Sequence, residues 1–331
     1  MNSLRHPLAD FFDKLYQVEV RRHYFPGVRF DAPAGDRGWF GPGSAMWRVF
    51  SHQQVTLLAL GAAAAIESTY PETEAANNDH SRVWTRDAQG RSTGRMSVRG
   101  NQVRKGHTMS FFMGTCFGPT EVAERLCRVV SGMHHQVKGT GAGGLVYDAD
   151  NPHTFRWNYA TLAWAFATAH EKYHPDPLDA QGIERFYREF TRVGEALGGT
   201  DLPASRQAVW DCLRSEFHRL KTPDHLETYR VAIIQGVEND RLRRIIPDLF
   251  EWAILEMQPP VVQRLVGFDR GNPLVAAARI RLTRDLLKAA RELGGPLREI
   301  REAYQRADGS KPPFPSPLPQ PLQRWLPGLF A

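Results

Sequence analysis

Two adjacent histidines, His134 and His135, lie near the end of a predicted helix that spans residues 118–139. Apolar residues recur at helical spacing between residues 122 and 137. On a 3.6-residue wheel, His134 falls roughly 80° from the centre of this apolar stripe, whereas His135 falls roughly opposite it. We therefore expect His134 to reach an apolar pocket and His135 to be solvated. Such a buried imidazole could ligate a metal, or it could simply be half-buried and bonded to a carbonyl.

A second group of chemically useful side chains precedes this segment. If residues 104–117 are helical, Arg104, His107, Thr108 and Phe111 share one face, because they follow i, i+3, i+4, i+7 spacing. A cation, an imidazole, a hydroxyl and an aromatic ring are unusual in a core stripe but suit the lining of a ligand pocket. Gly106 weakens the helix by ~1 kcal/mol relative to alanine.

Two short motifs match known patterns without the expected context. Residues 139–144 fit G-x-G-x-x-G, but they follow a predicted helix and lead into a polar stretch, so a nucleotide site is not expected. His170, Glu171 and His174 fit H-E-x-x-H, the pattern of zinc hydrolases. Because His174 precedes Pro175, it should lie on a terminating turn. A zinc-dependent hydrolase therefore stays an alternative rather than the leading hypothesis.

The elements that must position these residues are predicted to be helices, and no convincing series of strands is found. This pattern predicts an all-α protein with a single globular domain, residues 1–310, and a proline-rich tail, residues 311–331. A polar, basic loop is expected over residues 77–107, and Ser51 is expected to cap a helix. The expected helices cover residues 7–23, a start near 44, a start near 51, 104–117, 118–139, 154–173, 181–197, 203–220, 224–235, 238–257 and 273–293.

Composition narrows the class of protein further. The chain has 42 basic and 36 acidic residues, and within its basic segment only Trp84 offers a stacking platform, so nucleic acid is not an expected partner. Its three scattered cysteines and the lack of an N-terminal signal peptide suit the cytoplasm. The most apolar stretch, residues 55–66, is about half of the roughly 20 residues that span a bilayer. The oligomeric state is not indicated.

Several pieces of the chain line up with a known family over roughly residues 35–235. The chain resembles the haem-dependent oxygenases related to latex clearing protein (rubber oxygenase) and to the MpaB oxygenase of mycophenolic acid biosynthesis. The pieces that carry the resemblance are Gly41-PGSAMWRV, Asp79-HSR, Arg104-x-x-x-Thr108, Phe117-Gly118-x-x-Glu121, His134-x-x-Val137-x-Gly139, Tyr147-x-Ala149-x-x-Pro152 and Trp157.

The resemblance implies a fold, a cofactor and roles for individual residues. It implies a globin-like core that binds haem b, with His134 as the proximal iron ligand. The implied catalytic residues are Arg104, His107 and Thr108 on the distal side, where His107 either ligates the iron or donates a hydrogen bond to O2. The resemblance also places Arg104, Trp157 and Tyr159 in contact with the cofactor.

The expected function is therefore a haem-dependent oxygenase that acts with O2 on a small apolar molecule, an alkene or an aromatic. The alternatives are a non-catalytic protein that binds haem or another apolar ligand, and the zinc hydrolase. Two departures from the family pattern are visible. The family often has W-x-H where this chain has Trp157-Asn158-Tyr159, and rubber oxygenases can have a distal lysine at the position of His107.

Overall fold

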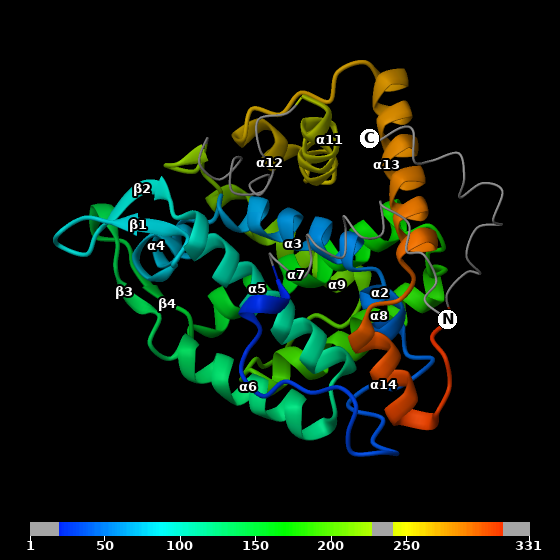
Figure 1. Ribbon diagram of the computed structural model, residues 1–331. Coiled ribbons are helices and arrows are strands. Elements are labelled where there is room, and N and C mark those ends of the chain that lie inside the picture. The colour runs from blue at the N-terminus through cyan, green and yellow to red at the C-terminus, as the bar shows by residue number, and fades with distance from the viewer. Residues whose placement is uncertain (1–19, 227–240, 314–331) are drawn as a thin grey trace.

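The computed structural model describes residues 20–226 and 241–313 and confirms that the protein is mainly helical (Figure 1). Most of the expected 7–23 and 224–235 helices and of the 311–331 tail lies outside these residues. The described helices are η1 (Arg21–His23), α2 (Ala45–Phe50), α3 (Gln53–Glu67), α4 (Pro71–His80), α5 (Val98–Phe117), α6 (Thr120–His134), η2 (Ala142–Gly144), α7 (Pro152–Tyr173), α8 (Ala180–Ala196), α9 (Arg206–Glu216), η3 (Phe217–Arg219), α11 (Arg241–Glu256), α12 (Pro260–Leu265), α13 (Pro273–Gly294) and α14 (Arg298–Asp308).

The centre of the core is the contact between α3 and α7. Both helices carry buried alanines. Ala59 and Ala62 on α3, and Ala163 and Ala167 on α7, are almost completely buried. Short side chains allow two helix backbones to approach closely, so these alanines set the packing distance. α11 lies against α3 at Gly61, where a Cβ atom would come within 2.4 Å of the Ile254 side chain.

Helix starts agree with the sequence at some positions and correct it at others. α2 begins beside residue 44 as expected, and Ser44 caps it, because its side chain accepts a hydrogen bond from the Trp47 N–H. The prediction that Ser51 caps α3 is wrong. Ser51 ends α2, its hydroxyl donates to the Arg48 carbonyl at 2.8 Å, and α3 begins one residue after His52.

Two small antiparallel hairpins were not expected from the sequence. In the first, β1 (Trp84–Arg86) pairs with β2 (Ser92–Met96) inside the segment that was predicted to be a loop. The loop prediction is also wrong at both ends of the segment, because those residues belong to α4 and α5. In the second hairpin, β3 (Lys138–Thr140) pairs with β4 (Val146–Asp148). The glycine-rich stretch forms this turn, which is followed by β4 and not by a phosphate-binding helix.

The turn between α5 and α6 is held in place by α14. Arg306 is 2% exposed, and its guanidinium donates to the backbone carbonyls of Phe30, Asp36, Phe117 and Gly118 at 2.6 to 3.2 Å. A charged group that is buried in this way is satisfied by several carbonyl dipoles. The C-terminal helix of the described chain thus fixes the α5–α6 pair from one side.

Two further observations concern the state of the cysteines and the length of the helices. Cys116 and Cys127 are buried and unpaired, and burial raises the pKa of the Cys127 thiol to about 12. Cys212 is unpaired and half-buried. Within residues 20–226 and 241–313, no helix combines the length and the apolar composition needed to cross a membrane.

Candidate active site between helices α5 and α6

Helices α5 and α6 form an antiparallel pair that is joined by Gly118 and Pro119. The two helices touch where α5 has no side chain. A Cβ atom on Gly114 would lie 2.2 Å from the Leu126 Cδ1 atom, so a larger residue would force the Leu126 side chain to shift. Because the helices run in opposite directions, the first turns of α5 lie beside the last turn of α6. This arrangement brings the segment of Arg104 to the end of α6.

His134 is the last residue of α6, which therefore ends five residues earlier than the expected limit at Gly139. The ring is half-buried and has no hydrogen-bond partner among the described residues. Burial lowers the pKa of His134, and the positive charge of Arg104 lowers it further. The imidazole is therefore neutral at neutral pH, which leaves a nitrogen lone pair available to a ligand.

His135 is exposed, as its position on the predicted helix indicated. Its side chain is 59% exposed, and its Nδ1 atom lies 2.6 Å from a carboxylate oxygen of Asp150. The carbonyl of His134 accepts a hydrogen bond from the Val137 N–H, and this bond ends the helix in a turn. The two neighbouring histidines thus differ in both exposure and partner.

The three side chains predicted for the distal side lie near the middle of α5. Arg104 is exposed, but its charge acts on His134, on His107 and on Glu67. The Thr108 hydroxyl donates to the Arg104 carbonyl at 3.0 Å, so its proton is used within the helix. The structure therefore brings Arg104 near His134, and Thr108 adjoins Arg104.

His107 has a more enclosed position than Arg104. Its ring stacks on Phe25, with 4.4 Å between ring centroids and 13° between planes. Burial lowers the pKa of His107, and the charges of Arg82 and Arg104 add to that effect. One face of the imidazole is thus covered by the segment before α2, and the ring is neutral at neutral pH.

Trp157 and Tyr159, the two predicted cofactor contacts on α7, point in different directions. Trp157 is 1% exposed and stacks on Tyr70, with ring centroids 4.8 Å apart. Tyr159 is 5% exposed, stacks on Phe190 of α8 at 5.3 Å, and has a buried hydroxyl without a hydrogen-bond partner in the described chain. Two residues apart on a helix lie on roughly opposite faces, so the two rings do not line the same surface.

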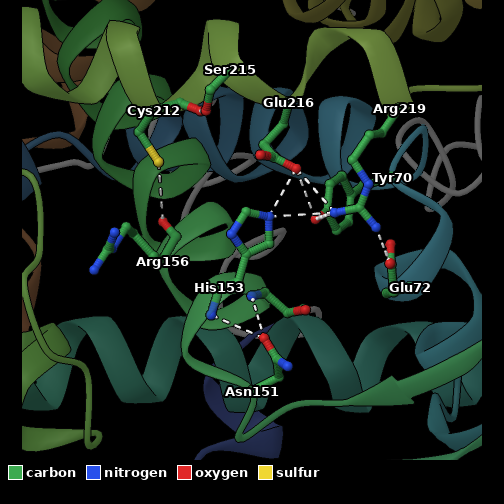
Figure 2. Close-up of polar contacts among 10 residues, drawn as sticks. Tyr70, Glu72, Asn151, His153, Arg156, Cys212, Ser215, Glu216 and Arg219 are labelled. Atoms are coloured by element: carbon green, nitrogen blue, oxygen red, sulfur yellow. Dashed lines mark hydrogen bonds and ion pairs between the residues drawn. The ribbon is translucent and has the colours of Figure 1, made fainter.

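Figure 2 shows how the partner of the Trp157 ring is held. The Tyr70 hydroxyl donates to Glu216 at 3.2 Å and accepts from Arg219. Arg219 also pairs with Glu72 and Glu216, and His153 Nε2 lies 3.0 Å from the same Glu216 oxygen. Because these groups come from α4, α7 and the α9–η3 segment, the network fixes the position of the Tyr70 ring.

Glu67, at the end of α3, is a candidate functional residue that the sequence reasoning missed. Burial raises its pKa to about 7, although a hydrogen bond with Thr161 and the charge of Arg104 act in the opposite direction. The Thr161 hydroxyl lies 2.8 Å from Glu67 Oε1 and 2.7 Å from the Asn158 carbonyl. One hydroxyl proton cannot serve both oxygens well. If Glu67 is protonated, its carboxyl donates to Thr161, whose own proton then goes to Asn158.

The signal that could have revealed Glu67 is its context in the sequence. It is the one charged residue at the end of an apolar, alanine-rich helix, and an acid in such a position is unusual unless it has a partner or a proton. Thr161 lies one helical turn beyond Trp157 on the same face of α7. Trp157, Thr161, Glu67 and Arg104 thus connect α7 and α3 to the α5–α6 pair.

Other pieces of the sequence that were matched to a family meet at the open end of this pair. The Tyr147 hydroxyl of β4 donates to Asp79 at 2.7 Å and lies 3.0 Å from the His80 ring nitrogen. A Cβ atom on Gly139 would come within 2.6 Å of the same hydroxyl, so the strand needs glycine at that position. Residues that are distant in sequence therefore support the segment that follows His134.

The H-E-x-x-H residues lie elsewhere and are already engaged. His170 Nε2 accepts a hydrogen bond from the Leu178 N–H, and His174 Nδ1 accepts one from the Asp176 N–H, both at 3.0 Å. Glu171 is held by Arg206 in a two-pronged ion pair at 2.6 and 2.9 Å. In the described part of the chain, no group of three or more His, Cys, Asp or Glu side chains could hold a metal ion. The geometry therefore gives the zinc alternative no support.

Comparison with known proteins identifies the family. A family model described as the catalytic domain of the ER-bound oxygenase mpaB/B' and rubber oxygenase matches residues 47–292. The chain belongs to this family. The searches of curated proteins and of solved structures returned no significant match.

The match to the mpaB/rubber oxygenase family covers a different range of residues from the resemblance seen in the sequence. It starts after residue 46 and extends into α13, whereas the recognised motifs covered roughly residues 35–235. All of the candidate residues from Glu67 to Tyr159 lie inside the matched range. The membership makes the protein an oxygenase-type oxidoreductase, and it leaves the cofactor and the substrate to the argument below.

Proposed function

We propose that this protein is a haem b-dependent oxygenase that acts with O2 on a small apolar molecule, an alkene or an aromatic. The observation that carries the proposal is the neutral imidazole of His134, which has no hydrogen-bond partner among the described residues and lies beside Arg104 in a member of an oxygenase family. An imidazole of this kind is a common axial ligand of haem iron.

The residues around His134 fit a haem group in their chemistry. His134 would ligate the iron, and Arg104 would pair with a carboxylate of the porphyrin. The neutral His107 ring could donate a hydrogen bond or act as a second ligand. Bound haem would supply the redox chemistry with O2, which amino-acid side chains do not provide.

The protein's own contribution is to orient the substrate and to control protons. Arg104 would place positive charge where negative charge develops on oxygen. Glu67, with a pKa of about 7, can hold a proton or release it near neutral pH, and Thr161 lies within hydrogen-bond distance of it. An apolar substrate needs an apolar surface, and Trp157 and Phe111 are buried aromatic rings on the helices that carry these residues.

The first experiment compares the two neighbouring histidines. Purified protein from haem-replete cells should show a haem absorption spectrum with about one haem b per chain. His134→Ala should lose most of the haem, whereas His135→Ala should retain it, because His135 points away and is bonded to Asp150. A colourless wild-type protein, or equal loss in both variants, would contradict the proposal. Consumption of O2 with an apolar substrate then separates an oxygenase from a non-catalytic haem carrier.

A further inference from the structure

Three buried histidine rings lie together where the start of α3, the end of α7 and helix α13 meet. His52 precedes α3, His170 belongs to α7, and His174 ends α7. The ring centroids of His170 and His174 are 4.3 Å apart, and those of His52 and His174 are 5.6 Å apart. Burial lowers the pKa of all three rings, so each is neutral at neutral pH and carries one proton and one lone pair.

Backbone contacts fix the position of the proton on two of these rings. His174 Nδ1 accepts a hydrogen bond from the Asp176 N–H at 3.0 Å, so the proton of that ring is on Nε2. His170 Nε2 accepts one from the Leu178 N–H, also at 3.0 Å, so the proton of this ring is on Nδ1. The His170 Nδ1 atom is buried and has no hydrogen-bond partner among the residues that the structure describes.

The Nε2–H of His174 points at Arg291 of α13. The distance from His174 Nε2 to Arg291 Nη1 is 3.5 Å, and both side chains are buried. A guanidinium can only donate hydrogen bonds, so this contact joins two donors. Within residues 20–226 and 241–313, no acceptor is found for the His174 Nε2–H. A buried donor without an acceptor destabilises a protein, and an acceptor shared by both groups would remove this conflict.

Positive charge surrounds these donors. Besides burial, the charges of Arg48 and Arg291 lower the pKa of both rings. The acids whose charges act on Arg291 are Asp176 and Glu292. Asp176 is 65% exposed and pairs with Arg48, and Glu292 pairs with Lys288 at 3.9 Å. The nearby carboxylates therefore already have cationic partners, and the missing acceptor is best supplied by an anion.

We propose that a small halide-like anion binds between α7 and α13, where it accepts hydrogen bonds from the His174 Nε2–H and the Arg291 guanidinium beside the His170 ring. A water molecule fits the cluster less well, because it brings two protons that need acceptors of their own. Among the three rings, the one unused acceptor is His52 Nδ1, since His52 Nε2 lies 3.0 Å from the Leu287 carbonyl and carries the ring proton.

The bound anion would hold the end of α7 against α13, two helices that already lie in contact. None of its ligands belongs to the α5–α6 pair, which carries the proposed haem ligand. Anion binding and haem binding can therefore be tested separately, and failure of one leaves the other unaffected.

The first test is thermal unfolding of the purified full chain at about pH 7.5 and constant ionic strength, in sodium chloride, bromide or gluconate. Gluconate is too bulky to enter a buried contact. The unfolding midpoint should lie about 2 °C higher in either halide than in gluconate, once the halide is roughly twentyfold above its dissociation constant. The proposal fails if the midpoint is the same in all three salts.

A substitution on α13 ties the effect to this site. Arg291→Gln removes the charge and offers an amide oxygen that can accept from the His174 Nε2–H, so the difference between halide and gluconate should disappear. Arg284→Gln is the matched control on the same helix, because Arg284 donates to the Lys172 carbonyl of α7, and it should keep the difference. An Arg291→Gln variant that keeps the full difference would place the halide elsewhere. Comparing salts within each variant cancels any general loss of stability.

A direct observation completes the test and needs no variant. Crystals of the full chain that are soaked in bromide should show an anomalous diffraction peak within hydrogen-bond distance of His174 Nε2 and Arg291 Nη1. A water molecule at that position, without anomalous signal, would overturn the proposal.

Discussion

The protonation of Glu67 links the chemistry of the candidate site to the pH dependence of the protein's stability. The pKa of this carboxyl is raised from 4.5 to about 7, mainly because the group is buried. A raised carboxyl pKa means that the folded protein disfavours the charged form. Ionisation of Glu67 therefore lowers the free energy of unfolding as the pH rises above the pKa of the unfolded chain. This loss reaches its full size above about pH 7.

Replacing Glu67 by glutamine should remove this cost, because glutamine carries no charge. We expect Glu67→Gln to raise the free energy of unfolding at about pH 8 by on the order of 1 to 3 kcal/mol and to change it little at about pH 5. If Glu67 also moves a proton during turnover, the variant should lose the part of the pH–rate profile that titrates near 7.

Denaturant unfolding of the purified protein at both pH values measures the effect of this change on stability. Glu195→Gln, at an exposed position on α8, is the control and should show no such difference. A Glu67→Gln variant that is less stable than the wild type at high pH would mean that the carboxylate is ionised and paired in the folded state.

Among the elements, the α5–α6 pair depends on one glycine. Gly114→Ala should destabilise the protein by about 1 to 3 kcal/mol, because the new Cβ atom would lie 2.2 Å from Leu126 Cδ1. The same change at Gly132 on α6 is the control, since nothing lies within 4 Å of a Cβ atom there. Gly132→Ala should instead stabilise the protein by roughly 0.5 to 1 kcal/mol.

Thermal unfolding, together with the haem content of each variant, checks this comparison. If haem binds at His134 as proposed, the haem content of Gly114→Ala should also fall, because a shift between α5 and α6 would separate Arg104 from His134. Equal stability of the two variants would show that the helices can move apart at little cost.

The same elements show what the sequence could and could not predict. Long helices such as α7 and α8 were found because their apolar residues repeat at helical spacing over many turns. The end of α6 was misplaced, since the apolar spacing continues to Val137 although the chain turns at His134. The β1–β2 hairpin was missed because its strands are three and five residues long and mostly polar. Glu67 was missed because its partners Arg104 and Thr161 come from distant helices.

On the scale of the whole molecule, three buried histidines hold the C-terminal helices against the core. His52, His170 and His174 are at most 2% exposed, and their rings adjoin one another. His52 Nε2 lies 3.0 Å from the Leu287 carbonyl of α13, and His174 faces Arg291. Arg48 and Asp176 are the other charged groups beside them.

These histidines should make the protein sensitive to acid. Burial lowers the pKa of His52 to about 4 and that of His170 to about 3, and it also lowers the pKa of His174. Histidines in the unfolded chain have a pKa of about 6.5. The free energy of unfolding therefore falls as the pH falls below that value. The loss is on the order of 2 kcal/mol per histidine at about pH 5.

Denaturant midpoints measured between about pH 7.5 and pH 5 should therefore fall steeply in the wild type. His52→Asn should flatten this dependence, whereas His218→Asn, at an exposed position, should not. A midpoint that stays constant over this range would show that the histidines titrate normally in the folded state.

The buried thiols of the α5–α6 pair have a practical consequence for an enzyme that works with O2. Peroxide and related oxidants attack the thiolate form of cysteine, and burial keeps Cys116 and Cys127 protonated. The helices that carry the candidate active site thus contain no easily oxidised thiol of their own. The protein should tolerate repeated turnover in air without a thiol reductant, and Cys212 is the cysteine at which slow oxidative damage would begin.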